Sequence, residues 1–325
     1  MHAHMALNQQ VRSLPPFAQW ALTRRIPCAV LAMLMYGSVM AFVGTLLSLP
    51  LLVLHLLTPT LFAVIALGGG FAFAMQVAAV AGIGVTLLAY GDFGPGLMLL
   101  ILYGALPILA ATTLGKEGGV SKSGLNLALG LITTMLVVLI SGAGLHDGTV
   151  MEYVRQLLAP LFEASRQEGM DPVMLQRIEA TTAWIFPGLT VLCLWLLWWG
   201  DVILARNIAV YYGFFRGDTQ PVSDFRLPRS VAYGFMLLMA VASFAGGTAQ
   251  YLATNTGLVI AGLLAAQGLA VVHTWLHARR LQIAAIVMYV MLLIQPVMVL
   301  PFAMIGLLDI WFDYRRNIMP ADGGK

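Results

Sequence analysis

The chain has few charged residues and hardly any cysteine. Charged residues make up 10% of its 325 residues and hydrophobic ones 60%, whereas soluble proteins carry about 25% charged residues. This composition excludes an ordinary soluble domain and indicates a membrane protein. The two cysteines, Cys28 and Cys193, lie inside apolar runs. We interpret them as small buried residues, and not as a disulfide or a set of metal ligands.

Recognisable catalytic motifs are also missing. The sequence has no His-Glu-x-x-His pattern for zinc hydrolysis and no Gly-x-Ser-x-Gly nucleophile elbow. His273 and His277 would share one face of a helix and could bind a metal, but Trp275 and two arginines surround them at a predicted membrane exit. We interpret them as an interfacial cluster. We therefore expect no enzyme activity, no cofactor and no metal site.

Long apolar runs dominate what is present. A membrane-spanning helix needs roughly 20 apolar residues, and glycine-rich turns at residues 68–70 and 91–95 separate several such runs. The pattern predicts an all-α fold, a polytopic transmembrane helix bundle of about ten spans, with nine as the alternative. The expected spans lie near residues 26–43, 46–67, 71–90, 95–114, 123–143, 181–203, 230–249 and 256–275, followed by the apolar stretch 281–312.

Three segments need separate predictions. Pro50 and Pro59 should kink the second span. Within residues 144–179, apolar side chains recur at helical spacing, which predicts an amphipathic helix on the periplasmic surface of the membrane. Residues 281–312 are too long for one untilted helix. Pro296 and Pro301 allow a hairpin of two short helices there, and a single crossing stays open as the alternative.

The positions of the basic residues predict the orientation. If the N-terminus is inside, only Arg155, Arg166 and Arg177 fall outside, and the other lysines and arginines fall inside. This distribution obeys the positive-inside rule and places both termini in the cytoplasm. The basic residues are spread over several loops, so we expect the lipid bilayer, and no nucleic acid, as a partner.

The last apolar run ends in a mixed charged and aromatic stretch. Residues 306–316 read Gly-Leu-Leu-Asp-Ile-Trp-Phe-Asp-Tyr-Arg-Arg. This stretch resembles the C-terminal signature of the YybS-like family of uncharacterised bacterial membrane proteins, Gly-Leu-Leu-x-x-Trp-Phe-Asp-Phe-Arg, with Tyr314 where phenylalanine is usual. A weaker match is Asp-Phe-Arg-Leu-Pro at residues 224–228. The resemblance implies a bacterial inner-membrane protein and brings no biochemical function with it.

The resemblance also implies a domain organisation. The family is similar in fold to the substrate-binding components of energy-coupling-factor transporters and to MreD, a cell-wall scaffold subunit. By this analogy residues 1–25 are a cytoplasmic lead-in. Residues 26–215 are a six-helix part that includes the segment 144–179, and residues 216–325 are a C-terminal extension ending in the cytoplasm.

The C-terminal stretch supplies a candidate interaction surface. Opposite charges at a low-dielectric boundary should pair. If residues 303–316 form one helix, Asp309 and Asp313 share a face, with Arg316 three residues further on. Two interpretations need the same residues, a docking surface for a protein partner and an intramolecular lock. The candidate residues are Asp309, Trp311, Phe312, Asp313, Arg315, Arg316 and Arg226.

A candidate ligand pocket is expected around His55 and Gln76. His55 lies mid-span between two prolines, where a kinked backbone can leave carbonyl groups free. The alternative is a histidine that bonds a neighbouring helix's carbonyl or Gln76. The other glutamines within the spans, Gln250, Gln267 and Gln295, are expected to make helix–helix hydrogen bonds.

Two functions remain open from the sequence. The first is a non-catalytic scaffold or assembly subunit of a membrane complex, with a membrane or cytoplasmic protein as partner. The alternative is a small-molecule binding or transport component. The transporter components usually carry Ala-x-x-x-Ala in their first helix, but here Ala29 and Ala32 are three apart. A pocket of convergent polar groups would favour transport, and a filled bundle with an exposed Arg/Trp patch would favour the scaffold.

Overall fold

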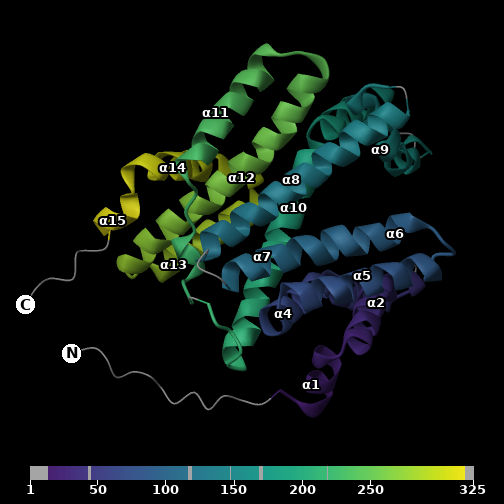
Figure 1. Ribbon diagram of the computed structural model, residues 1–325. Helices are drawn as coiled ribbons and strands as arrows, with labels where there is room; N and C mark the ends of the chain where they lie inside the picture. Colours follow the sequence, from purple (N-terminus) through teal and green to yellow (C-terminus); the bar gives the residue numbers. More distant parts are fainter. Residues whose placement is uncertain are drawn as a thin grey trace, which may run out of the picture. The chain divides into compact units, whose positions relative to one another are not determined.

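The computed structural model describes residues 14–42, 45–115, 119–146, 148–167, 171–217 and 219–318. Within these ranges the regular structure is helical and contains no strand (Figure 1). The prediction of an all-α, polytopic helix bundle is therefore confirmed. The described residues belong to two compact units, residues 1–127 with 195–219 and residues 128–194 with 220–325. Helices α8 (Gly119–Leu145) and α10 (Pro172–Tyr211) contribute residues to both units. The predicted domain boundaries, between residues 25 and 26 and between residues 215 and 216, remain predictions.

The first unit contains the helices before α8. They are α1 (Pro16–Thr23), α2 (Arg25–Ala41), α3 (Ser48–Leu56), α4 (Thr58–Gly69), α5 (Phe71–Leu88), α6 (Phe93–Met98), the π-helix η1 (Leu99–Ala105) and α7 (Leu106–Gly115).

Proline and glycine set the breaks between these helices. The second predicted span is interrupted at Leu57, where α3 ends and α4 begins. Pro59 lies in the first turn of α4, where a missing N–H leaves no hydrogen bond unmade. Gly70 has φ +84°, a conformation that side-chain-bearing residues rarely adopt, and it separates α4 from α5. The predicted kink is thus a break between two helices.

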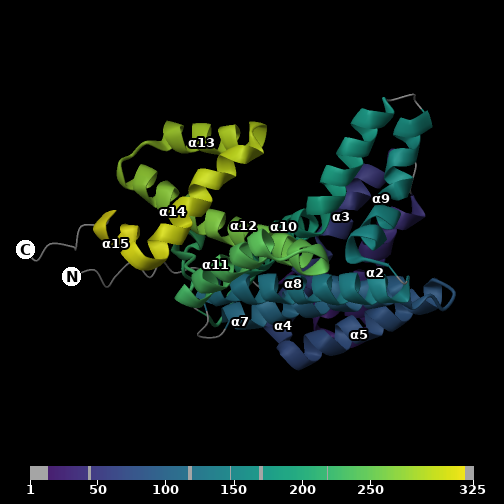
Figure 2. The ribbon, with the colours of Figure 1, turned by 90° about the horizontal axis from the view of Figure 1, so that it is seen from above.

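The second unit is built around the long helix α12 (Gly247–Ala278), against which α11 (Arg229–Phe244) and α14 (Val299–Phe312) pack (Figure 1). Helix α13 (Gln282–Ile294) and α14 are bent by 119° at the break between them (Figure 2). The remaining elements are α9 (Val150–Gln167), α15 (Tyr314–Ile318) and the short 3-10 helices η2 (Val222–Asp224) and η3 (Pro296–Met298).

Fewer helices than expected are long enough to cross a membrane. Among the described residues, six helices have the length and apolar composition of a span, or seven if the bent pair α13–α14 counts as one. The expected nine or ten spans included two runs that fold as shorter apolar helices, Arg25–Val39 and α11. The six are Ser48–Gly69, Phe71–Leu88, Phe93–Gly115, Gly119–Leu145, Pro172–Tyr211 and Gly247–Ala278.

The amphipathic segment is helix α9, which begins at a capping box. The Glu152 carboxylate accepts hydrogen bonds from the backbone N–H of Thr149 at 2.7 Å and from its hydroxyl at 2.8 Å. The Glu152 N–H donates to the Thr149 hydroxyl oxygen at 3.3 Å. Of the apolar residues of α9, Val154 and Leu158 are buried, while Leu157 and Leu161 are exposed. The predicted amphipathic helix is therefore present.

The capping box makes the first turn of α9 sensitive to acid. The hydrogen bond from the Thr149 backbone N–H has the largest effect on the pKa of Glu152 and lowers it, and the hydrogen bond from the Thr149 hydroxyl lowers it further. A lowered folded-state pKa adds stability above the ordinary glutamate value of about 4.3, and this stability is lost as the pH falls through the lowered value. We expect hydrogen exchange at residues 148–153 to be slower in wild type than in E152Q at neutral pH, with the difference disappearing well below pH 4. A difference that persists unchanged in acid would contradict this assignment.

Candidate functional site

A contact between two glycines brings α12 and α14 close together. A Cβ atom placed on Gly306 would overlap the carbonyl oxygen of Leu264 and lie 2.8 Å from the backbone nitrogen of Gly268. A Cβ atom on Gly268 would overlap the carbonyl oxygen of Phe302 and lie 2.9 Å from the nitrogen of Gly306. Backbones can approach this closely only where both helices present small residues. The crossing puts neighbouring polar side chains of the two helices within reach of each other.

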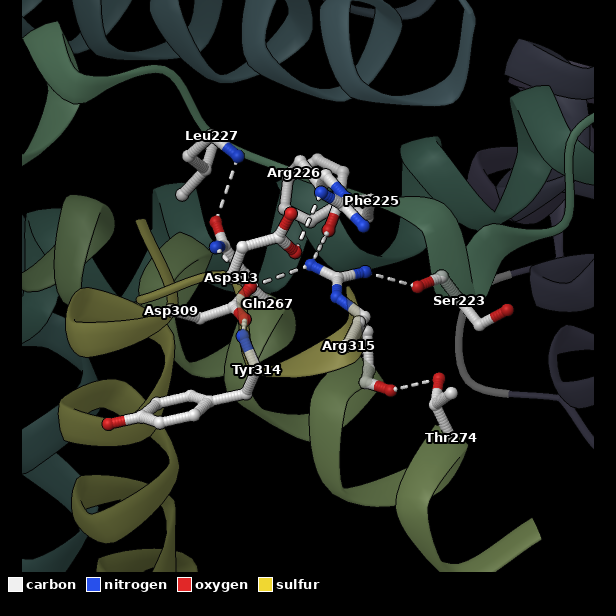
Figure 3. A network of polar contacts seen from close by, with 11 residues as sticks. Ser223, Phe225, Arg226, Leu227, Gln267, Thr274, Asp309, Asp313, Tyr314 and Arg315 are labelled. Atoms are coloured by element: carbon white, nitrogen blue, oxygen red, sulfur yellow. Dashed lines mark hydrogen bonds and ion pairs between the residues drawn. The ribbon is translucent and has the colours of Figure 1, made fainter. Parts of the chain in front are cut away.

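The first of these side chains are Gln267, next to Gly268, and Asp309, one turn after Gly306. The Gln267 amide nitrogen donates to Asp309 Oδ2 at 2.8 Å, and the Gln267 amide oxygen accepts the backbone N–H of Leu227 at 2.8 Å. Asp309 Oδ1 accepts the backbone N–H of Tyr314 at 2.9 Å. Gln267 and Asp309 are both buried. Helix α12, helix α14 and the loop before α11 are therefore joined by one polar network (Figure 3).

Arg315 completes the network from the turn after α14 (Figure 3). Its guanidinium lies 3.0 Å from Asp309 Oδ2 and donates to the carbonyl oxygens of Ser223 and Phe225, the latter at 2.9 Å. Both members of the ion pair are 4% exposed. A buried charge needs a paired and hydrogen-bonded partner, and here each charge has several. We call Gln267, Asp309, Arg315 and the backbone groups of residues 223–227 that they bind the C-terminal clamp.

Asp313 makes the turn that carries Arg315 back to the network. Helix α14 ends at Phe312, and Asp313 has φ +44°, in the left-handed region that aspartate tolerates better than most residues. Its carboxylate pairs with Arg226 at 2.9 Å, and both side chains are about half exposed. An exposed pair of this kind contributes about 0–1 kcal/mol. The main structural role of Asp313 is therefore the turn that positions Arg315, and its ion pair with Arg226 is secondary.

The structure separates the predicted interaction surface into two sets. Residues 303–316 are not one helix, because the chain turns at Asp313, so Arg315 and not Arg316 reaches Asp309. Trp311 and Phe312 are 37% and 62% exposed, and Arg316 is exposed as well. Asp309 and Arg315 thus have the internal contacts expected of a lock. Trp311, Phe312 and Arg316 stay available to a partner.

An aromatic neighbour enlarges the exposed set. The ring of Tyr233 on α11 makes an edge contact with Trp311 at 6.3 Å between centroids, and Tyr233 is itself exposed. The rings of Phe312 and Tyr314 stack at 5.9 Å. We call Tyr233, Trp311, Phe312 and Arg316 the C-terminal patch. The sequence pattern predicted its last three members, and Tyr233 joins them only through the packing of α11.

His55 lies in the first unit with both ring nitrogens occupied. The carbonyl oxygen of Tyr36 can only accept, so Nδ1 donates to it, at 2.6 Å. Nε2 shares a hydrogen bond of 2.8 Å with the hydroxyl of Tyr103, which belongs to the π-helix η1. Trp198 packs edge-on against Tyr103. His55 therefore has the carbonyl partner that the sequence offered as the alternative to a ligand.

Gln76 does not belong to this group. Gln76 is exposed, and no hydrogen bond joins it to His55. Asp201 is buried in the first unit, where it accepts a hydrogen bond from the Thr60 hydroxyl at 2.7 Å. Gln250 donates to the carbonyl oxygen of Ala242, a contact between α12 and α11 of the kind expected for the glutamines. In the described ranges, no three His, Cys, Asp or Glu residues are placed to hold a metal ion.

A cavity of about 350 Å³ lies between α9 and the start of α10, and no pattern in the sequence predicts it. Its polar lining includes Arg155, Gln156, Arg166, Gln176 and Glu179. Arg166 pairs with Glu179 at 2.6 Å and with Glu163 at 3.3 Å. The sequence pattern predicts only a surface helix here, and the cavity arises from the packing of α9 against α10.

Comparison with known proteins gives one result. A family model described as "Predicted membrane protein (DUF2232)" matches residues 37–310. No curated protein and no solved structure matches the chain. The matched residues include the glycine contact, Gln267, Asp309, His55 and the α9–α10 cavity, and they end just before the turn that carries Arg315.

Proposed function

We propose that the chain, which belongs to the family of predicted membrane proteins DUF2232, is a non-catalytic scaffold or assembly subunit of a membrane complex. In this role it binds a protein partner through the C-terminal patch. The patch is the observation that carries the proposal. The clamp fixes the end of α14 and the turn after it, and Trp311, Phe312 and Arg316 on either side of this turn are exposed.

The chemistry of the patch suits a protein contact. Tryptophan, tyrosine and arginine are the residue types that dominate binding energy at interfaces. A patch held by a buried network is also ordered before binding, which lowers the entropy lost on association. The C-terminal stretch resembles the YybS-like family, and the fold analogy that this resemblance implies, to the scaffold subunit MreD, points to the same role. We place the protein in the inner membrane of a bacterium with both termini in the cytoplasm, although the termini themselves lie outside the described residues.

Site-specific crosslinking tests the docking role. A photoreactive amino acid at Phe312 should give a discrete protein adduct in cells, and the matched position Met304, exposed 57% on the same helix, should give none. Adding R316Q should weaken the adduct at Phe312 without changing the amount of folded protein, because Arg316 is exposed. No protein adduct at Phe312, or equal adducts at both positions, would remove the docking proposal.

The second candidate function is small-molecule binding or transport, and the α9–α10 cavity is the observation that favours it. The cavity lies beside an amphipathic helix, not around His55. Native mass spectrometry of the gently extracted protein compares the two functions. A stoichiometric protein partner supports the scaffold. A reproducible small-molecule adduct without such a partner supports transport.

A further inference from the structure

The α9–α10 cavity has a lining of two kinds. Half of the side chains that line it are apolar, and among them are Phe162 from α9 and Ala180 and Ala183 from α10. The others are charged or amide-bearing, with two arginines, one glutamate and two glutamines. At about 350 Å³ the cavity is near the lower limit for small-molecule sites, which are typically about 300–1,000 Å³. Its size suits the head of an amphiphile better than a whole drug-sized molecule.

The charges in the lining are unequally compensated. Arg166 is held by Glu179 and Glu163 on its two sides. Arg155 makes no ion pair with any residue that the structure describes. It has an electrostatic interaction with Glu152, whose carboxylate is hydrogen-bonded to Thr149. Of the two arginines in the lining, Arg155 is thus the one without an ion pair, and its guanidinium is available to attract an anion. Guanidinium groups bind phosphate with two parallel hydrogen bonds.

The length and charges of α10 indicate that the cavity lies at the end of the membrane-spanning part of this helix. Helix α10 has 40 residues and is about 60 Å long, twice the roughly 30 Å of hydrocarbon in a bilayer. Its N-terminal end carries Arg177 and Glu179, so this end extends beyond the hydrocarbon, and the apolar lining residues Ala180 and Ala183 follow directly. On α9, Leu157 and Leu161 are exposed on another face, as in helices that lie at a membrane surface.

We propose that the α9–α10 cavity binds the phosphate-bearing headgroup of an anionic membrane lipid. The phosphate sits on Arg155, with Gln156 and Gln176 available as further hydrogen-bond donors, and the first carbons of the lipid lie against Phe162 and the α10 alanines. The same charge could also attract free phosphate, so the test separates the two sources. This proposal is independent of the C-terminal patch, which belongs to other helices.

The full chain in a neutral detergent is titrated with dioctanoyl phosphatidylglycerol, dioctanoyl phosphatidylcholine and inorganic phosphate, and bound ligand is counted by native mass spectrometry. We expect the phosphatidylglycerol to bind at least tenfold more tightly than the other two. R155Q should weaken this binding about tenfold, because it removes a charge-assisted hydrogen bond. The matched control is R177Q, which removes the same charge from an exposed residue of the same hairpin that does not line the cavity.

A second variant tests the cavity itself without changing charge. A159F should fill the space beside Arg155 and reduce binding, while the protein keeps its elution volume and melting temperature. Equal effects of R155Q and R177Q would show charge attraction without a site and overturn the proposal. Inorganic phosphate binding as tightly as the lipid would show a free-anion site and overturn it as well.

Discussion

The full chain carrying G306A should lose most of its folded population in detergent, although the change adds only one methyl group. The new Cβ atom would overlap the carbonyl oxygen of Leu264 and sit 2.8 Å from the nitrogen of Gly268. Both neighbours are helix backbone, which cannot rotate away as a flexible side chain can. The helices α12 and α14 must therefore separate, and overpacking of this kind costs about 3 kcal/mol or more.

Gly257 provides a matched control on α12. A Cβ atom there would lie 3.9 Å from the Leu238 Cβ, an ordinary contact. G257A should therefore leave the melting temperature unchanged or raise it, because alanine favours a helix by about 1 kcal/mol over glycine. G268A should resemble G306A, since its Cβ meets backbone atoms of α14. If G306A and G257A melt at the same temperature, the close crossing is wrong.

The glycine substitutions also have an effect beyond packing. Gln267 precedes Gly268, and Asp309 follows Gly306 by one turn, so separating the helices lengthens the 2.8 Å hydrogen bond between their side chains. Residual folded G306A should then show faster hydrogen exchange in residues 223–227, which the clamp holds in place. A slower exchange there than in G257A would contradict the coupling between the crossing and the clamp.

The sequence predicts where helices form better than it predicts how many of them are long enough to span a membrane. Apolar runs and the breaks at glycine residues 68–70 depend on neighbouring residues, and the structure has helices in each of the expected places. The length of a helix depends instead on how its ends pack and turn. For this reason the run at residues 230–249 gives α11, which is too short for a clear span, and α10 extends far beyond the predicted span 181–203.

The site could be predicted only in part, for a related reason. Buried opposite charges are expected to pair. This rule identifies the aspartates and arginines of residues 309–316 as candidates. Which arginine points inward depends on the left-handed turn at Asp313, and no local pattern marks a turn at an aspartate flanked by aromatic residues. Gln267 lies 42 residues before Asp309. The α9–α10 cavity likewise depends on how two separate helices pack, which spacing along the chain does not reveal.

R315M should be the most damaging single substitution among the charged residues of the C-terminal stretch. It removes the partner of a carboxylate that is 4% exposed and leaves the carbonyl oxygens of Ser223 and Phe225 without their donor. Breaking a buried pair in this way costs about 3–5 kcal/mol, because one charge remains buried without compensation. R316M is the matched control, since Arg316 is adjacent and exposed, and its effect should stay within about 0.5 kcal/mol. Thermal melting of both full-length variants in the same detergent measures the difference.

The partner substitution shows whether the damage comes from the unpaired charge. In D309N/R315M the residue at position 309 is neutral, and its single amide oxygen still accepts one of the two hydrogen bonds, from the N–H of Tyr314 or from the amide of Gln267. The double variant should therefore be about 1–3 kcal/mol more stable than R315M alone, a coupling typical of residues in direct contact. Additive effects of D309N and R315M would mean that the two groups do not interact, and the clamp would not be a lock. Because R315M acts on stability and R316Q on crosslinking at Phe312, the two sets of residues are separable by experiment: the inner set holds the turn, and the outer set is what a partner meets.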